Sequence, residues 1–425
     1  MLARRSYRER VQTILHRSSR RAWETASFVV VPRQDTATGA SGYTVDLSMR
    51  SFWEAQTWLE ADVVIVGAGL VGVQTAIAHA AQRPRDRVLL LERGYMPTGA
   101  STRNAGFACI GSVSEVAVDV DLHGPDRAVE IVQMRSEGLA GLLSTCEGHD
   151  VGFTRQGGHE IFLDEHPALQ RIDEINELLQ PVTGLATFER HDAWIAPFGF
   201  APSVQHLVSS PVEGTLDSGK LLDVLWGIAQ HRGVMIRTGV HVVSINEGAG
   251  TASVYARVGT EDVCIRAGSV VVATNAWIPE LVHDHAASAI IPARGQIIVT
   301  EPVPSMPLTG SYHFDEGYVY FRPVGNRILL GGARNLDFNA EQTTSHDVSQ
   351  QIQEALETLL RDVIAPSHTD LRIDHRWSGT MAFSPTKQPI IDRVSPHVIV
   401  AFGCNGMGVA LSSSIAKRVT ELLNY

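Results

Sequence analysis

The clearest pattern of hydrophobic positions lies early in the chain. Residues 63–66 form a short, fully apolar run, which is typical of a strand buried on both faces of a parallel sheet. The run leads directly into a glycine-rich turn at residues 67–72 and an Ala-rich stretch that predicts a helix from Leu70 to about Gln82. A second apolar run, Val88–Leu91, predicts another strand, and Glu92 follows it. The pattern therefore predicts a strand, a tight turn, a helix and a second strand.

Further along the chain, apolar positions predict an alternation of helices and strands. Helical spacing occurs over residues 126–146, 167–179, 217–231, 349–363 and 409–423. Strand patterns occur over residues 157–163, 193–200, 234–237, 241–245, 253–257, 263–265, 269–273, 297–300, 312–314, 318–321, 328–332 and 398–402. The three runs between 253 and 273 indicate a small antiparallel layer that returns to the parallel sheet.

The turn after the first strand has the spacing G-x-G-x-x-G. Gly67 allows the tight strand-to-helix turn, Gly69 lets the backbone approach a pyrophosphate, and Gly72 permits close packing of helix on strand. Free N–H groups at the helix start would face the negative phosphates, which adds Leu70 and Val71 to the candidates. Glu92, twenty residues after the last glycine, is placed to accept hydrogen bonds from an adenosine ribose. Together these features predict a dinucleotide site, and the alternative is a glycine-rich turn that binds nothing.

Composition restricts the classes of protein that fit. The 425 residues allow two or three domains, or two interleaved ones, with ample core. The net charge of −11 argues against a nucleic-acid binder, which would normally show a basic face. No run of 18 apolar residues is present, so we expect no transmembrane helix. Four cysteines lie far apart without a C-x-x-C pair, which indicates reduced thiols in an intracellular protein and neither a disulfide framework nor a metal site: Cys109, Cys146, Cys264 and Cys404.

The first 24 residues differ in composition from the rest of the chain. They contain seven arginines and two acids, with several serines, which is the composition of a mitochondrial transit peptide. Two alternatives carry equal weight. The segment is a disordered basic tail, or it is upstream sequence translated from a misassigned start, in which case Met49 would be a natural start. Residues 32–48 predict a linker, so residues 1–48 are interpreted as a basic extension and linker. We expect an intracellular protein, mitochondrial if the extension is a targeting peptide and otherwise cytoplasmic.

After Glu92 and Arg93 the chain is rich in small residues with hydroxyl and amide groups. Residues 99–106, Gly-Ala-Ser-Thr-Arg-Asn-Ala-Gly, suit a backbone that wraps closely around a flat, polar ligand. This segment, the glycine motif with Glu92, residues 270–277 (VVVATNAW) and residues 403–408 (GCNGMG) resemble the FAD-dependent D-amino-acid oxidase superfamily. That group holds sarcosine, glycine and γ-glutamylputrescine oxidases. The resemblance covers nearly everything from about residue 60 to the end.

The resemblance implies an α/β fold with two interleaved units. One is a Rossmann-like FAD-binding domain of the glutathione-reductase type, with a parallel sheet, over residues 60–108, 212–285 and 366–425. The other is an α+β substrate domain built on an antiparallel sheet, over residues 109–211 and 286–365. Besides the first motif and Glu92, the implied FAD contacts are Arg93, Ala100, Ser101, Thr102, Asn104, Ala105, Gly106, Val243, Ala273, Thr274, Gly379, Gly406, Met407 and Gly408. For the adenine contact Val242 matches as well as Val243, and a plain buried valine is equally compatible.

The long β region from 290 to 333 supplies the candidates for substrate contacts. Aromatic residues alternate along it, and alternation puts Tyr318 and Tyr320 on one face of their strand. In the family such a sheet forms the roof of the substrate cavity over the flavin. The alternative is a tyrosine-rich packing face. Tyr318, His313 and Arg322 are the candidates for assisting catalysis, and each has a structural role as its alternative.

Three positions depart from the pattern of the resembling families. Gly379 stands where monomeric sarcosine oxidases carry the cysteine that bonds the flavin, which predicts a dissociable, non-covalent FAD. Met381 stands where glycine oxidase would require an arginine, and Ala410 where sarcosine oxidases have a lysine, both for a substrate carboxylate. An unpaired buried carboxylate costs roughly several kcal/mol, so a secondary amine or a polyamine derivative fits better than a simple α-amino acid bound in that manner. Three other cations could substitute: Arg322, Arg103 and Lys387.

The sequence therefore predicts an FAD-dependent amine or amino-acid oxidase or dehydrogenase. A C–N bond of a secondary amine, amino acid or polyamine derivative would be oxidised by hydride transfer to the flavin N5, and the imine would then hydrolyse. Oxygen, or another acceptor such as a quinone or an electron-transfer flavoprotein, would reoxidise the flavin. The alternatives are a flavoprotein with a non-catalytic assembly role and a nicotinamide-dependent dehydrogenase. The expected partner is a small-molecule substrate, with no nucleic acid, and the sequence indicates no oligomeric state.

Overall fold

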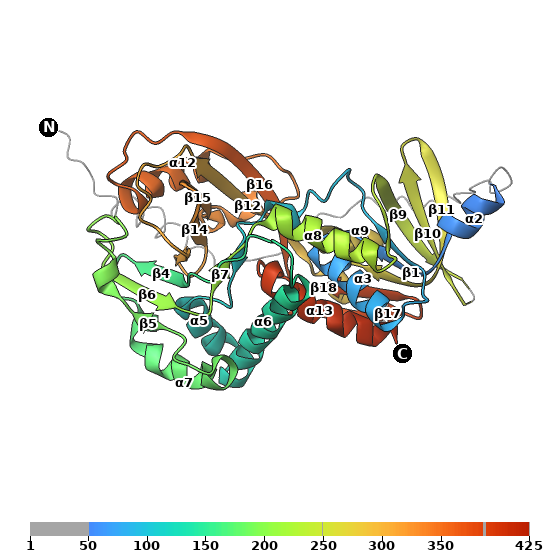
Figure 1. Ribbon diagram of the computed structural model, residues 1–425, viewed down its shortest axis with the longest axis horizontal. Helices are drawn as coiled ribbons and strands as arrows, with labels where there is room; N and C mark the ends of the chain where they lie inside the picture. The colour runs from blue at the N-terminus through green and yellow to red at the C-terminus, as the bar shows by residue number, and fades with distance from the viewer. Residues whose placement is uncertain (1–50, 249, 386–387, 425) are drawn as a thin grey trace.

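A computed structural model describes residues 51–248, 250–385 and 388–424 (Figure 1). The predicted basic extension and linker, residues 1–48, lie outside the described residues, as does Lys387. Two eight-stranded sheets lie toward opposite ends of the molecule in Figure 1, and helices cover them. The predicted α/β fold class is confirmed, with a mainly parallel and a mainly antiparallel sheet. No helix in the described ranges combines the length and the apolar composition needed to cross a membrane.

The first sheet has the order β17-β18-β11-β1-β2-β8, and β10 and β9 extend it from β11. β1 pairs in parallel with β2 and with β11, and β11 pairs in parallel with β18. Its strands are β1 (Glu60–Val66), β2 (Val88–Leu91), β8 (Met235–Arg237), β9 (Val240–Glu247), β10 (Ala252–Val258), β11 (Glu261–Val272), β17 (Ile390–Ser395) and β18 (Val398–Phe402).

Both faces of this sheet are buried, which explains the continuous apolar run in β1. Ile65 faces a core formed with α3 (Leu70–Gln82), α8 (Ser218–His231) and α13 (Gly408–Leu423). Val64 faces a second core formed with the β9–β10 layer, α9 (Ile278–Leu281) and α10 (His285–Ser288). Because successive side chains of a strand point to opposite faces, a strand between two apolar layers must be apolar throughout.

The second sheet has the order β16-β12-β15-β14-β13-β4-β6-β5. Its neighbours pair antiparallel except for β13 and β4, which pair in parallel. Its strands are β4 (Gly158–Phe162), β5 (Glu189–Arg190), β6 (His206–Ser210), β12 (Ile291–Thr300), β13 (Ser311–Phe314), β14 (Val319–Val324), β15 (Arg327–Gly332) and β16 (Ile373–Phe383). One face packs on α12 (Gln350–Leu359) and the π-helical turn Leu360–Ile364.

Shorter elements connect the two sheets. β3 (Phe107–Ala108) and β7 (Gly214–Thr215) form a two-stranded pair, and α5 (Val113–His123), α6 (Pro125–Thr145) and α7 (Ile172–Thr183) lie below the second sheet in Figure 1. The remaining helices are α2 (Phe52–Trp58), α4 (Ala100–Arg103) and α11 (Phe338–Glu341). α6 packs so closely on α13 that a Cβ added to Gly138 would overlap the Ala410 carbonyl. This contact ties the helices of the second unit to the first sheet.

Most predicted elements are confirmed, and several bounds coincide with those of the structure. The strand predicted at 193–200 is wrong: Asp192–Trp194 is a short 3-10 helix, followed by turns. Its apolar residues pack as an aromatic cluster around His159 and Tyr312, so tertiary contacts rather than strand alternation account for them. The runs at 263–265 and 269–273 belong to one strand, β11, and Tyr318 precedes β14.

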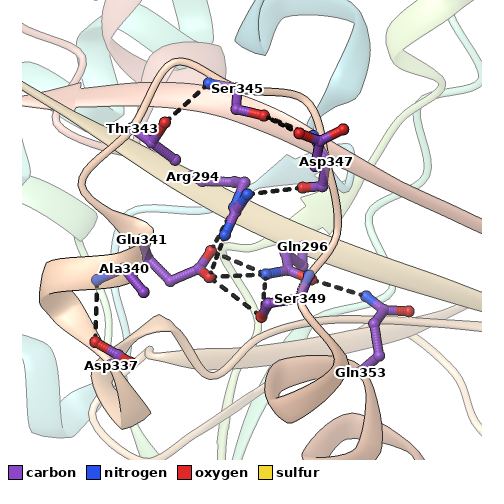
Figure 2. Close-up of polar contacts among 10 residues, drawn as sticks. All are labelled: Arg294, Gln296, Asp337, Ala340, Glu341, Thr343, Ser345, Asp347, Ser349 and Gln353. Atoms are coloured by element: carbon purple, nitrogen blue, oxygen red, sulfur yellow. Dashed lines mark hydrogen bonds and ion pairs between the residues drawn. The ribbon is translucent and has the colours of Figure 1, made fainter.

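A buried polar network fixes the segment that follows β15 (Figure 2). The Arg294 guanidinium donates to both carboxylate oxygens of Glu341, at 2.8 and 2.7 Å, and Gln296 Nε2 also donates to this carboxylate, at 2.9 Å. Arg294 further donates to the Asp347 carbonyl, and Ser349 N donates to Gln296 Oε1. Both ion-paired side chains are almost fully buried. Arg294 and Gln296, two alternate and buried positions of β12, therefore anchor α11 and the loop after it.

Candidate functional site

A large cavity lies where the carboxyl ends of the parallel strands face the second sheet. The ends of β1, β2, β11 and β18 line one part of it, and β12, β14 and β16 line another. The starts of α3 and α13 both border the cavity. In open α/β sheets, ligands bind outside the carboxyl ends of the strands, so the cavity occupies the position that the topology favours.

The first helix start is shaped by close backbone contacts. Gly67 has a φ of +102°, and an added Cβ there would lie 2.7 Å from the Ala273 carbonyl oxygen. An added Cβ at Gly69 would lie 2.6 Å from Ser101 Oγ, which accepts a hydrogen bond from Leu70 N at 2.9 Å. Gly72 does not line the cavity, because it packs against the Gly67 carbonyl, where a Cβ would overlap it. Gly67 and Gly69 thus border the cavity, as do Leu70 and Val71.

Glu92 lies at the end of β2, buried at the cavity wall. Its Oε2 accepts a hydrogen bond from Ala68 N at 3.3 Å, and its Oε1 accepts one from Gly94 N at 3.0 Å. A carboxylate has about four acceptor sites, so lone pairs are left for a ligand. The carboxylate therefore joins the glycine turn to the end of β2 and can still accept ligand hydroxyls.

The segment after Glu92 forms one wall and is fixed to β16. Arg93 lies over the Trp277 ring, 4.0 Å from its centroid, and both residues border the cavity. The Arg103 guanidinium donates to the Ser378 carbonyl at 2.7 Å, and Trp377 Nε1 donates to the Arg103 carbonyl. Four other predicted contacts line the cavity, namely Ala100, Ser101, Asn104 and Ala105.

Two predicted residues of this segment are turned away from the cavity lining. Thr102 Oγ1 donates to the Pro97 carbonyl at 2.7 Å. Gly106 has a φ of +70° and packs against the Leu216 carbonyl, which an added Cβ would overlap. The structure also distinguishes the two candidate valines of β9, because Val242 lines the cavity and Val243 does not. These residues shape the turn or strand without bordering the space.

The second glycine-rich turn faces the same cavity from β18. Gly406 has a φ of +88°, and Met407 and Gly408 lead into α13, with all three residues at the lining. Two thiols lie beside them. Burial raises the pKa of the Cys404 thiol to about 12 and, with the Glu213 charge, that of Cys109 to about 11, so both stay protonated at neutral pH. All four cysteines are free, as predicted.

An aromatic wall formed by the second sheet closes the other side. Tyr318 and Tyr320 both border the cavity, as the predicted alternation requires. Burial raises the pKa of Tyr320 to about 12 and also raises that of Tyr318, so both phenols stay neutral. Phe107 makes edge contacts with His313 and Tyr320, at ring-centroid distances of 5.3 and 5.8 Å. This wall offers mainly apolar surface and two hydroxyl groups.

His313 lies at the cavity wall between two carboxylates. Its Nε2 lies 3.4 Å from Glu213 Oε2, and its Nδ1 lies 3.6 Å from Glu115 Oε2. Burial alone would lower the pKa of His313, but its hydrogen bonds with Cys109 and Glu213 and the charges of both glutamates outweigh burial and raise it well above its ordinary value. His313 is therefore a buried imidazolium that can hold a proton at the edge of the cavity.

Arg322 does not line the cavity, although it follows Tyr320 by two residues on β14. Its guanidinium donates to the Leu216 carbonyl at 2.9 Å, and burial lowers its pKa to about 10. Met381 and Ala410, by contrast, both border the cavity. The two positions where the family resemblance would call for a cation are therefore occupied by uncharged side chains at the lining.

Arg334 is a lining residue that the sequence did not point to. It follows β15 in the 3-10 helix Arg334–Leu336, and its guanidinium lies over the rings of Phe383, Phe338 and Tyr318. No periodicity or motif distinguishes this arginine from others, because the rings that hold it come from three separate segments. Gly379, Ala273 and Thr274, which were predicted, also border the cavity.

The lining fits the dinucleotide that the sequence resemblance implies. The missing Cβ atoms at Gly67 and Gly69 leave backbone exposed at a helix start, which is the arrangement that receives a pyrophosphate. Thr274 Oγ1 is buried at the lining without a hydrogen-bond partner among the described residues. A polar ligand would satisfy that hydroxyl, since buried polar groups are normally hydrogen-bonded.

Comparison with known proteins points to one group of enzymes. Residues 62–422 match the family described as FAD dependent oxidoreductase, or DAO. A probable oxidoreductase, OrdL, from Haemophilus influenzae is 26% identical over 383 residues, which cover 85% of this chain and 83% of that protein. The gamma-glutamylputrescine oxidoreductase of Escherichia coli is 24% identical over 393 residues, with the same coverage.

The fold is also similar to that of solved structures. The crystal structure of L-proline dehydrogenase from P. horikoshii superposes with a TM-score of 0.70 at 18% sequence identity, covering 85% of this chain and 93% of that one.

Proposed function

The chain belongs to the family of FAD-dependent oxidoreductases known as DAO, and from this premise we propose that it oxidises a C–N bond of a secondary amine, an amino acid or a polyamine derivative. The observation that carries the proposal is the cavity itself. It begins at two glycine-rich helix starts suited to a dinucleotide and ends at an aromatic wall of the second sheet. One space can therefore hold the cofactor and a small substrate together.

The residues proposed to hold FAD are those predicted contacts that border the cavity. They include the first glycine turn, Glu92, the α4 segment and the second glycine turn at residues 406–408. Bound FAD would supply a two-electron acceptor for a hydride equivalent taken from the carbon next to nitrogen. Gly379 of β16 has no side chain that could bond the flavin, and the nearby thiols of Cys109 and Cys404 stay protonated and so are poor nucleophiles. Both observations support a non-covalent FAD.

The substrate side is proposed to orient an amine in a space from which water is excluded. Tyr318, Tyr320 and Met381 present mostly apolar surface, which favours a bound, desolvated substrate. His313 holds a proton between Glu115 and Glu213, and is proposed to assist proton movement at the edge of the site. Arg322 is proposed only as a positioning residue, since its guanidinium contacts the Leu216 carbonyl.

Similarity to one relative supports an amine as the substrate. One matching relative is named for a polyamine derivative, γ-glutamylputrescine, and it aligns over most of both chains. The family match favours FAD over the nicotinamide-dependent alternative. We also propose the interleaved division into an FAD-binding and a substrate domain that the sequence predicts. Its support is that β16, in the C-terminal segment, pairs with β12 of the proposed substrate domain, so the two domains share a sheet.

The test is reduction of the purified protein by a panel of amines without oxygen. We expect a yellow protein with absorbance near about 450 nm that is bleached by at least one secondary amine, amino acid or acylated polyamine. Free FAD mixed with the same amines is the control. Readmitting oxygen then shows whether it serves as the electron acceptor. A yellow protein that no amine bleaches would support the assembly role instead, and a colourless one would contradict the cofactor assignment.

A further inference from the structure

Arg334 is a cation at the cavity wall with no anionic partner in the described part of the chain. Its guanidinium makes no hydrogen bond or ion pair there, and its contacts are ring faces at centroid distances of 4.3 Å (Phe383), 5.1 Å (Phe338) and 5.4 Å (Tyr318). Contacts with ring faces leave the N–H groups at the edge of a guanidinium free to donate. The side chain is thus held in place while its donors remain available to the cavity.

The position of Arg334 is set by its backbone and by the buried network behind it. Ala333 has a φ of +61°, which a non-glycine residue adopts rarely, and its N–H donates to the Tyr318 carbonyl at 2.8 Å. Phe338 belongs to α11, whose last residue, Glu341, is bound by the Arg294 guanidinium (Figure 2). Arg334 and one of its three rings therefore lie on a short segment anchored at both ends.

The nearby carboxylates have other partners. Asp315 Oδ2 accepts from Asn335 Nδ2 at 2.8 Å, and Glu316 lies 3.8 Å from His166 Nε2. Glu115 lies beside His313 and accepts from Ser112 N at the start of α5. Burial lowers the pKa of Arg334, because no carboxylate offsets the loss of water around its charge. An anionic ligand would remove that imbalance, and a planar guanidinium can bind a carboxylate through two parallel hydrogen bonds.

We propose that Arg334 binds a carboxylate of the substrate, so that the substrate class is an amine that carries a carboxylate, such as an N-substituted amino acid, and not a free polyamine. This inference rests on the proposed function. It also accounts for the uncharged Met381 and Ala410 at the lining, since the anion anchor would lie on the segment after β15 and not on β16 or α13. The anchor and the aromatic wall then face the same bound molecule.

A binding titration tests the proposal without any turnover. The flavin absorbance spectrum of the yellow holoenzyme is recorded while straight-chain carboxylates from acetate to hexanoate are added, each matched by its amide. We expect at least one carboxylate to perturb the spectrum of the wild-type protein. Its amide should bind at least about thirtyfold more weakly. The chain length that binds best reports the space between Arg334 and the flavin.

Arg334→Gln and Arg334→Lys are the informative variants. Gln removes the charge and should weaken carboxylate binding by about thirtyfold or more, while leaving the amide unchanged. Lys keeps the charge but loses the paired donors, so an intermediate affinity is expected. Arg361→Gln is the matched control, because Arg361 lies in the π-helical turn outside the cavity and pairs with Glu357 on the surface. It should behave as wild type, and all three variants should keep their FAD.

The outcomes separate the two proposals. Carboxylates that bind the wild type and the Gln variant equally, or amides that bind as well as carboxylates, would overturn the role of Arg334 even if amines bleach the flavin. Loss of FAD from a folded Gln variant, one that melts at the temperature of FAD-depleted wild type, would overturn it too, because the arginine would then serve the cofactor. Selective carboxylate binding without bleaching by any amine would instead leave Arg334 as an anion anchor and reject amine oxidation.

Discussion

At the scale of single residues, His313 is distinguished by its charge and its surroundings. It is buried at the cavity wall between Glu213 and Glu115, with Phe107 against its ring. Buried imidazoles usually lose their proton, because burial disfavours the charged form. Here the hydrogen bonds with Cys109 and Glu213, together with the charges of Glu213 and Glu115, reverse that tendency and raise the pKa of His313 well above its ordinary value. The protonated ring therefore stabilises the fold as well as the edge of the site.

This charge predicts a pH-dependent stability. A pKa raised in the folded state stabilises the protein fully below the unfolded value, about 6.5 for histidine, and the contribution is lost as the pH rises through the folded pKa. His313→Gln should therefore lower the free energy of unfolding by about 1–3 kcal/mol below pH 6.5. The difference from wild type should shrink at higher pH, as measured by urea unfolding across the pH range.

His283→Gln is the control for this series, because His283 is exposed and its loss should leave the pH curve unchanged. A difference between wild type and the His313 variant that is independent of pH, or that grows with rising pH, would contradict a protonated His313.

At the scale of elements, α11 and its loop depend on ionic contacts more than on apolar packing. α11 has four residues, of which only Glu341 is buried. The Arg294–Glu341 pair is held by Gln296 and by backbone donors and acceptors, whereas the Arg372–Glu301 pair on the surface has an arginine that is 80% exposed. Loss of one partner from a buried ion pair lowers the stability of the fold strongly, whereas loss of one partner from an exposed pair changes it little.

Glu341→Ala should lower the free energy of unfolding by about 3–5 kcal/mol, because it leaves the Arg294 charge buried without a partner. The double variant Arg294→Met with Glu341→Leu should recover part of this loss, since it removes both charges. Arg372→Gln, the surface control, should change stability by about 1 kcal/mol or less. Urea unfolding midpoints measure all three. A Glu341 variant no less stable than the surface control would mean that the network does not anchor α11.

At the scale of the whole molecule, the cavity is the meeting surface of two sheets that each have a core of their own. Strand ends of the first sheet and strand faces of the second border the same space. A ligand that fills this space contacts both units, so its binding free energy adds to the stability of the folded chain. At a ligand concentration of a hundred times Kd the gain is about 2.7 kcal/mol.

Gly69→Asp should abolish retention of FAD, because an added Cβ would lie 2.6 Å from Ser101 Oγ and a carboxylate would repel the pyrophosphate. The variant should melt at the temperature of FAD-depleted wild type, whatever the FAD concentration. Absorbance near about 450 nm and a thermal melt with added FAD measure both effects.

Gly227→Ala serves as the control, because an added Cβ at this position of α8 meets nothing within 4 Å. It should keep FAD and gain up to about 1 kcal/mol of stability. Full yellow colour in the Gly69 variant would contradict the position given to the pyrophosphate.

Much of the first sheet and its motif could be predicted from the sequence. The bounds of α3, β2 and β18 follow from local periodicity and turn residues, and Glu92 follows from its spacing after the glycines. These features are local: a strand buried on both faces must be apolar, and a tight turn needs glycine, whatever the rest of the chain does. The same reasoning failed at residues 193–200, where an aromatic cluster around Tyr312 produced the apolar pattern.

The composition of the cavity wall was decided only by tertiary structure. Thr102, Gly106 and Arg322 carry the expected chemistry, yet none of them lines the cavity and each contacts backbone instead, whereas Arg334 borders the cavity against the ring of Phe383 from β16. The sequence determines which residues can form a strand, a turn or a helix start, because those depend on neighbours along the chain. Which side chains meet across the cavity depends on how two sheets pack, and that is set by contacts between residues far apart in the sequence.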